Sequence, residues 1–178
     1  TTVTEVRGRD RVQSVIISGV DERWRPVAGT EREIRCDTLL LSVGLIPENE
    51  LTRMAGATMD PVTGGPRVDE GYATDVPGIF AAGNVVQVYD LVDDVSEAAR
   101  IAGRSAGRYV RQGPREPGPA LRLVAGENVR AIVPQELHLS ALEEGPVVLQ
   151  FRVRHPVEAP VEAQVRLGSE DGPVLLAR

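Results

Sequence analysis

The alternation of apolar and polar residues changes three times along the chain. Residues 3–19 hold two β-rich runs on either side of the turn-prone tetrad Arg-Gly-Arg-Asp, which predicts a β-hairpin. Residues 38–43, Thr-Leu-Leu-Leu-Ser-Val, form a nearly unbroken apolar run that ends at Gly44. Such a run is typical of a strand buried on both faces of a parallel sheet. Pro47 prevents its continuation, and residues 50–55 are expected to form a short helix.

A second short apolar segment follows a turn. Residues 76–84 read VPGIFAAGN, so that a Val-Pro-Gly turn leads into a few apolar residues and a Gly-Asn ending. We expect residues 79–82 to form the last buried strand of the parallel sheet. The preceding Asp-Pro-Val-Thr-Gly-Gly of residues 60–65 has turn chemistry.

Helical spacing begins near Leu91 and continues to Val110. Its apolar residues recur at intervals of three and four and predict one apolar stripe: Val92, Val95, Ala99, Ala102, Ala106 and Tyr109. Asp90 and Asp93 lie at the start of this helix, where carboxylates suit free N–H groups and the helix dipole. The Pro/Gly cluster of residues 113–119 is the clearest boundary in the sequence.

The last third of the chain has short alternating segments separated by Gly and Pro. Residues 128–134, 147–154 and 161–167 show a period of two, with one polar and one apolar face. This pattern predicts a small antiparallel β module.

Composition narrows the function classes. A net charge of −6 and aromatic residues at 3% disfavour nucleic-acid binding as the main task. The single cysteine, Cys36, excludes an internal disulfide framework and fits a reducing compartment, so we expect a cytoplasmic protein. No apolar run approaches the roughly 20 residues of a membrane helix. The chain opens with Thr-Thr-Val instead of Met, and we therefore expect a trimmed or excised piece.

Two stretches together resemble a known family. CDTLLLSVGLIPENEL, at 36–51, resembles the apolar strand ending Gly-x-x-Pro-(Asn/Glu) that closes the NAD(P)H-binding insert of two-dinucleotide-binding-domain flavoproteins. TDVPGIFAAGN, at 74–84, resembles their Thr-x-x-Pro-Gly-(Ile/Leu)-(Phe/Tyr)-Ala-Ala-Gly-Asp motif, which is the second FAD contact. The order and separation of the two stretches are also those of the family. The chain thus resembles the pyridine-nucleotide-linked FAD oxidoreductases (pyridine nucleotide-disulfide oxidoreductase-like), and residues 84–103 look most like flavoproteins of glycerol and amine catabolism operons.

The resemblance implies a fold and a division into domains. It implies an α/β chain with a partial FAD/NAD(P)-binding Rossmann-like fold and a β-meander, followed by the small antiparallel β module. Residues 1–50 would be the C-terminal strands of the NAD(P)-binding insert, and residues 51–112 the C-terminal part of the FAD-binding domain. Residues 120–178 would form the β domain.

The resemblance also implies where the flavin would lie. Gly83 would let the backbone approach the ligand closely, and Asn84 would present its side chain at the carboxyl end of the strand. The family has Asp at this position, which accepts a hydrogen bond from a ribitol hydroxyl, and Asn keeps one acceptor oxygen. Val92 and Asp93, at the start of the predicted helix, complete the predicted cofactor contacts. No catalytic or metal-binding residue is predicted.

The glycine-rich Gly-x-Gly-x-x-Gly loops that hold FAD and NAD(P) in this family do not occur in the sequence. We therefore expect the C-terminal portion of an FAD-dependent, NAD(P)-linked oxidoreductase, inactive alone, whose partner is a missing N-terminal half or a partner subunit. The isolated chain should self-associate or leave an apolar patch exposed. The alternative is a non-catalytic scaffold or interaction module with a vestigial flavin motif.

Simpler interpretations exist for several of these residues. Gly83 and Asn84 could merely end a strand with a turn. His155-Pro156 resembles a motif of disulfide reductases but is interpreted as a chance match, and His138 as an ordinary histidine. Cys36 has no partner for dithiol chemistry and is interpreted as structural.

Overall fold

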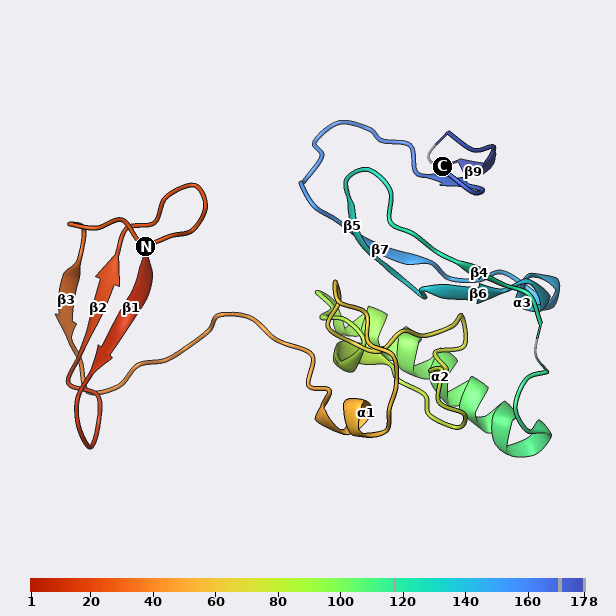
Figure 1. Cartoon of the computed structure of the whole chain (residues 1–178), viewed down its shortest axis with the longest axis horizontal. Coiled ribbons are helices and arrows are strands. Elements are labelled where there is room, and N and C mark those ends of the chain that lie inside the picture. The colour runs from red at the N-terminus through yellow and green to blue at the C-terminus, as the bar shows by residue number, and fades with distance from the viewer. Residues whose placement is uncertain (117, 170, 178) are drawn as a thin grey trace. The chain divides into compact units, whose positions relative to one another are not determined.

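The computed structural model describes residues 1–116, 118–169 and 171–177, with the backbone alone for 175–177. The chain divides into two compact units, Thr1–Gly44 and Leu45–Arg178 (Figure 1). None of the described helices combines the length and the apolar character that a membrane crossing requires.

The first unit is a three-stranded antiparallel meander. Strands β1 (Thr2–Arg7), β2 (Ser14–Ser18) and β3 (Arg32–Arg35) lie in that order, so the predicted hairpin and meander are confirmed. Val15 of the central strand pairs with Val6 on one side and Ile34 on the other. The central strand is the buried one, because its neighbours shield both of its edges.

The apolar segment, residues 38–43, does not form the predicted strand. Leu40, Leu41 and Val43 are instead exposed, at 88%, 69% and 89%. A buried parallel strand needs hydrogen-bonding neighbours, and all pairings among the described strands of this chain are antiparallel. The expectation of an exposed apolar patch is confirmed.

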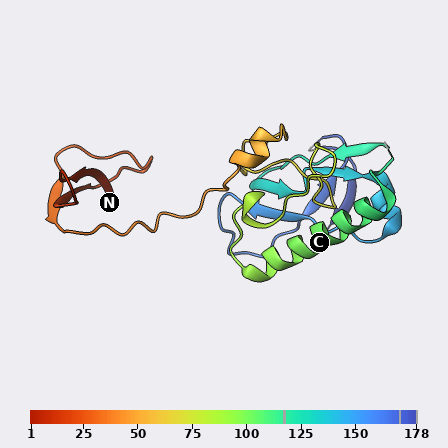
Figure 2. The same ribbon diagram turned by 90° about the horizontal axis from the view of Figure 1, so that it is seen from below.

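The second unit begins with a short helix and ends with the antiparallel strand pairs β4–β6, β5–β7 and β8–β9 (Figure 2). Between the short helix and a long helix lies a loop-rich segment, residues 55–91, which we call the loop layer. The predicted helices and the predicted β module are therefore present. The elements of the second unit are α1 (Glu50–Met54), the 3₁₀ helix η1 (Gly83–Val85), α2 (Val92–Gln112), β4 (Ala120–Arg122), β5 (Val129–Val133), β6 (Glu136–His138), α3 (Leu139–Glu144), β7 (Gln150–Val153), β8 (Gln164–Arg166) and β9 (Val174–Ala177).

Residues 79–82 do not form the predicted strand either. This segment has one isolated antiparallel bridge, between Ala73 and Phe80. The Phe80 ring packs edge-on against Tyr109 of α2, with centroids 5.9 Å apart. Contacts with the long helix thus replace the neighbouring parallel strands, which this chain does not supply among its described residues.

The core of the second unit joins the loop layer, α2 and one strand of the β module. It consists of small and medium apolar residues: Val68, Tyr72, Ala81, Val86, Ala98, Ala102 and Val133. Two positions of the predicted stripe of α2 are exposed, Val92 and Ala99, and the fully buried residue is Ala98 instead. Ala98 is three residues from Val95 and four from Ala102, so it fits the same helical period.

The β module is tied to the loop layer by hydrogen bonds at Val68. The backbone N–H of Gln135 donates to the Val68 carbonyl at 3.0 Å, and the Val68 N–H donates to Gln135 Oε1 at 3.0 Å. Both parts therefore belong to one compact unit. The division into three domains at 50, 112 and 120 stays a prediction.

Candidate functional site

Gly83 opens η1 in a conformation that favours glycine. It is buried and has φ = +74°, in the left-handed region. A Cβ atom placed there would lie 3.2 Å from Cγ1 of Val95, in the first turns of α2. Gly83 thus brings η1 into close contact with the N-terminal end of the long helix.

Asn84 follows Gly83 with an exposed side chain. Its Oδ1 accepts the backbone N–H of Tyr89 at 3.1 Å, which closes the loop between η1 and α2. The expectation that Asn84 stands at the end of a parallel strand is wrong for the described chain, because residues 79–82 are not a strand.

Val92 and Asp93 lie in the first turn of α2, and both are exposed. The N-cap residue is Leu91, which makes no side-chain capping bond. The first N–H groups of a helix have no partner inside the helix, so this turn offers backbone donors. Gly83 contacts α2 at Val95, and a cofactor role for Gly83, Asn84, Val92 and Asp93 stays a prediction.

Asn49 supports this arrangement and was not predicted. Its side chain is buried, and Nδ2 donates to the carbonyls of Gly64 at 3.0 Å and Val85 at 2.9 Å. One amide thus fixes η1 to the turn at residues 60–65. Asn49 lies within the motif at 36–51, and only the spatial contact reveals its support of η1.

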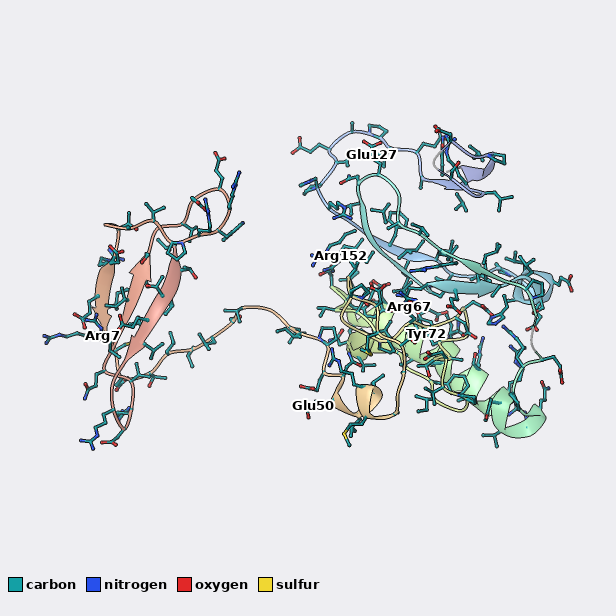
Figure 3. All side chains as sticks on the ribbon, viewed as in Figure 1. Arg7, Glu50, Arg67, Tyr72, Glu127 and Arg152 are labelled. Carbon is teal, nitrogen blue, oxygen red and sulfur yellow. The ribbon has the colours of Figure 1, made fainter. Side chains whose placement is uncertain are left out.

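A hydrogen-bonded triangle holds the loop after Asn84. Tyr72 Oη donates to Gln150 Oε1 at 3.2 Å, and Tyr89 Oη donates to the same oxygen at 2.8 Å. Burial raises the pKa of Tyr72 well above its ordinary value, and the adjacent Tyr89 hydroxyl adds to this rise. The Tyr72 hydroxyl therefore stays a neutral hydrogen-bond donor. Figure 3 labels Tyr72 within the loop layer.

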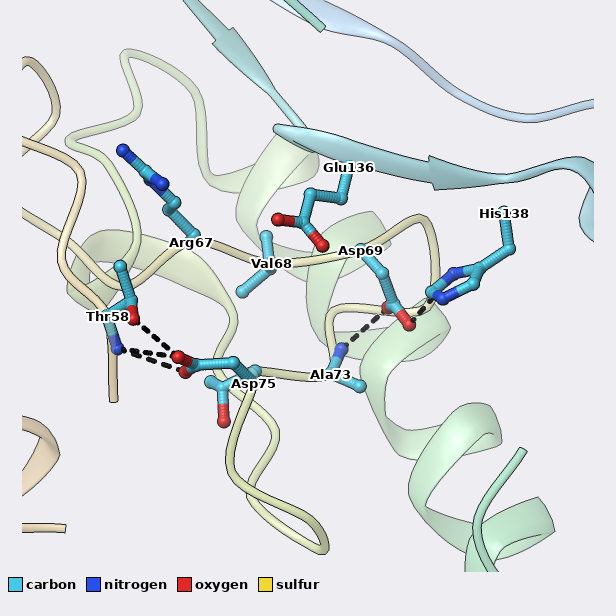
Figure 4. Close-up of a pocket in the computed structure, with 9 residues that line it drawn as sticks. Thr58, Arg67, Val68, Asp69, Ala73, Asp75, Glu136 and His138 are labelled. Atoms are coloured by element: carbon cyan, nitrogen blue, oxygen red, sulfur yellow. Dashed lines mark hydrogen bonds and ion pairs between the residues drawn. The ribbon is translucent and has the colours of Figure 1, made fainter. Parts of the chain in front are cut away.

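A polar hollow of about 220 Å³ lies in the same unit, between the loop layer and β6 (Figure 4). Carboxylates dominate its ionisable lining: Asp69, Asp75 and Glu136, with Arg67 and His138. Hydrogen bonds from the Thr58 hydroxyl and backbone lower the pKa of Asp75 below its ordinary value, against a smaller effect of burial. No sequence pattern had pointed to this hollow.

Comparison with known proteins gives the chain a family. The model of the pyridine nucleotide-disulphide oxidoreductase family matches residues 1–106, more than half of the chain. This range includes Gly83, Asn84, Val92 and Asp93. The match confirms the predicted fold class, a partial Rossmann-like α/β fold with a β-meander, to which the structure adds the small antiparallel sheets.

Individual relatives agree with this match. Thioredoxin reductase of Treponema pallidum (strain Nichols) is 30% identical over 111 residues, which are 62% of this chain and 33% of that protein. The CoA-dependent NAD(P)H sulfur oxidoreductase of Pyrococcus abyssi (strain GE5 / Orsay) is 28% identical over 149 residues, 84% of this chain and 27% of that protein.

A solved structure, thioredoxin reductase from Streptococcus pyogenes MGAS5005, has 25% sequence identity and a TM-score of 0.36, and the likeness covers 62% of this chain and 34% of that one. The chain therefore spans about a third or less of the length of these relatives. On the family match over residues 1–106, the chain belongs to the pyridine nucleotide-disulphide oxidoreductase family.

Proposed function

We propose that this chain is the C-terminal portion of an FAD-dependent, NAD(P)-linked oxidoreductase and contributes contacts to the flavin. The observation that carries the proposal is the placement of Gly83 and Asn84 against the first turns of α2, inside the matched range. The relatives named as reductases and NAD(P)H oxidoreductases support the reaction class.

The residues present fit one part of a flavin, its ribitol chain and the polar edge of its ring. Gly83 has no side chain to block approach, and the exposed Asn84 amide offers one acceptor and two donors. The first turn of α2 adds backbone N–H donors without a side-chain cap. These groups would bind and orient polar oxygens of the cofactor.

The same residues do not fit the cofactor's pyrophosphate. No glycine-rich phosphate loop occurs in the sequence, and Asp93 and Asp94 place negative charge at the N-terminal end of α2. The pyrophosphate would be bound by glycine-rich loops on another segment or subunit. A bound flavin would accept a hydride from the nicotinamide of NAD(P)H or donate one to NAD(P)⁺.

The exposed apolar segment supports the need for a partner. Leu40, Leu41 and Val43 lose contact with water only if another polypeptide segment covers them, and burial of each such side chain stabilises by about 1.5–3 kcal/mol. A parallel sheet completed by an N-terminal half or a partner subunit would do so. The finer proposal, a flavoprotein of glycerol or amine catabolism, rests on the resemblance of residues 84–103 alone.

The experiment measures FAD affinity in the longest polypeptide encoded with this chain, purified with any subunit that accompanies it. Asn84→Ala should weaken FAD binding about tenfold, the equivalent of one hydrogen bond. Asn84→Asp keeps the acceptor oxygen and should retain normal affinity. Gln164→Ala, which removes an exposed amide from β8, is the matched control and should have no effect.

Two results would contradict the proposal. Equal FAD affinity in the Asn84→Ala and unaltered proteins would remove the assigned role of Asn84. A purified protein that binds no flavin in any variant would favour the scaffold or interaction module with a vestigial motif.

A further inference from the structure

Three metal-ligating side chains from distant parts of the sequence meet at the edge of the hollow. Asp69 and Glu70 lie in the loop layer, and His138 is the last residue of β6. One ligand atom from each lies within 4.8 Å of the other two. Nδ1 of His138 is 3.3 Å from Glu70 Oε2 and 3.7 Å from Asp69 Oδ2. Ligands of a tetrahedral zinc ion stand roughly 3.3–3.5 Å apart, so the distance from His138 to Glu70 already matches and the distance to Asp69 must shorten slightly.

Local hydrogen bonds hold the two carboxylates in place. Asp69 Oδ1 accepts the backbone N–H groups of Gly71 at 2.8 Å and Ala73 at 2.9 Å, which leaves Oδ2 on the side of His138. Glu70 Oε2 accepts the backbone N–H of His138 at 3.0 Å. Arg115 binds the other oxygen, Oε1. Both oxygens of Glu70 therefore have partners in the protein, and its Oε2 and Asp69 Oδ2 are the oxygens that lie beside the imidazole.

The cluster is substantially buried, and its charge is incompletely balanced. The side chains of Glu70 and Asp69 are 6% and 15% exposed. Burial raises the pKa of Asp69 above its ordinary value, and the neighbouring charge of Glu70 contributes to the rise. Burial alone would also raise the pKa of Glu70, but hydrogen bonds from the His138 backbone and Arg115 keep it lowered. A cation between the two carboxylates would relieve their repulsion.

The hollow gives a bound ion room for further ligands. Asp69 and His138 line it directly, and Figure 4 shows the Glu136 carboxylate beside them. Zinc sites often have three protein ligands and a fourth position that is occupied by water. The imidazole nitrogen favours zinc and similar transition metals over Mg²⁺ and Ca²⁺, which prefer oxygen ligands alone.

We propose that Asp69, Glu70 and His138 form a binding site for one divalent transition-metal ion, with water from the hollow completing its coordination. The ion would connect the loop layer directly to β6. The site is separate from the contacts of Gly83 and Asn84, and the proposal does not depend on flavin binding.

The test is calorimetric titration of Zn²⁺ into the chelator-treated 178-residue chain, with Mg²⁺ as the comparison ion. Cys36 is replaced by Ser throughout, so that its thiolate cannot bind the metal. One Zn²⁺ per chain should bind with a dissociation constant of about 1 μM or lower, and Mg²⁺ should not compete. The thermal midpoint should rise on addition of Zn²⁺.

The two histidines of the chain provide a matched pair of variants. His138→Gln should weaken Zn²⁺ binding at least about tenfold and abolish the thermal shift, whereas His155→Gln should leave both unchanged. Asp69→Asn retains Oδ1 for the turn and should also weaken binding, which keeps the test informative if His138→Gln fails to fold. Absence of Zn²⁺ binding, or equal affinity in Asp69→Asn and the unaltered chain, would overturn the proposal.

Discussion

At the scale of single residues, Gly65 and Gly103 occupy opposite environments. A Cβ atom at Gly65 would lie 2.1 Å from the carbonyl oxygen of Val86 and 2.5 Å from its Cα. A Cβ atom at Gly103, in the middle of α2, would meet nothing within 4 Å. Gly65 therefore permits close approach of the turn at 60–65 to the residue that follows η1.

Gly65→Ala should lower the free energy of unfolding by about 1–3 kcal/mol, because the backbone at Val86 must move. Gly103→Ala is the control and should raise it by about 0.5–1 kcal/mol, since alanine is the better helix former. Urea unfolding followed by circular dichroism measures both. Equal effects of the two substitutions would show that the close approach to Val86 is not needed.

Single residues also show what a sequence can and cannot reveal about a site. Gly83 and Asn84 were predictable because they end a contiguous motif. The pairing of Glu70 with His138 was not, because 68 positions separate them and only the packing of β6 brings them together. No role was predicted for Asn49 for the same reason, since its partner Val85 lies 36 positions away.

At the scale of elements, α2 follows its sequence closely. A period of three and four specifies a helix locally, and hydrogen bonds within the helix need no partner segment. The segments at 38–43 and 79–82 were predicted as strands from their apolar character, but a strand requires a neighbour to accept its hydrogen bonds. The described residues supply none for a parallel sheet.

The shifted stripe of α2 gives a direct test of packing. Ala98→Leu should lower the free energy of unfolding by about 1–3 kcal/mol, because Ala98 is 0% exposed and the core has no room for the larger side chain. Ala99→Leu should change it by no more than about 0.5 kcal/mol, since Ala99 is exposed. Thermal unfolding of both variants provides the measurement, and the reverse order would support the originally predicted stripe.

At the scale of the whole molecule, the chain holds two compact units, and its described residues include no strand that pairs with the apolar segment at 38–43. The family of the chain could be recognised from two motifs, at 36–51 and 74–84, and both lie within the range that the family model matches. The conformations of residues 38–43 and 79–82 could not be predicted, because a strand forms only where a neighbouring segment accepts its hydrogen bonds.

The exposed apolar segment should drive self-association of the chain in isolation. Sedimentation velocity over a range of concentrations should detect oligomers, and Leu41→Glu together with Val43→Glu should weaken the association at least tenfold, on the order of 1.4 kcal/mol. Val110→Glu, at an equally exposed position on α2, is the control. A monomer at every concentration would contradict the expectation.

The two hydrogen bonds of the Asn49 amide also set a limit for protein engineering. A chimera that exchanges the first unit for a homologous one can be joined anywhere up to Gly44 without touching η1. A graft whose junction falls after Asn49 replaces the residue that holds the Gly64 and Val85 carbonyls. Such a graft would have to bring an asparagine of its own to position 49.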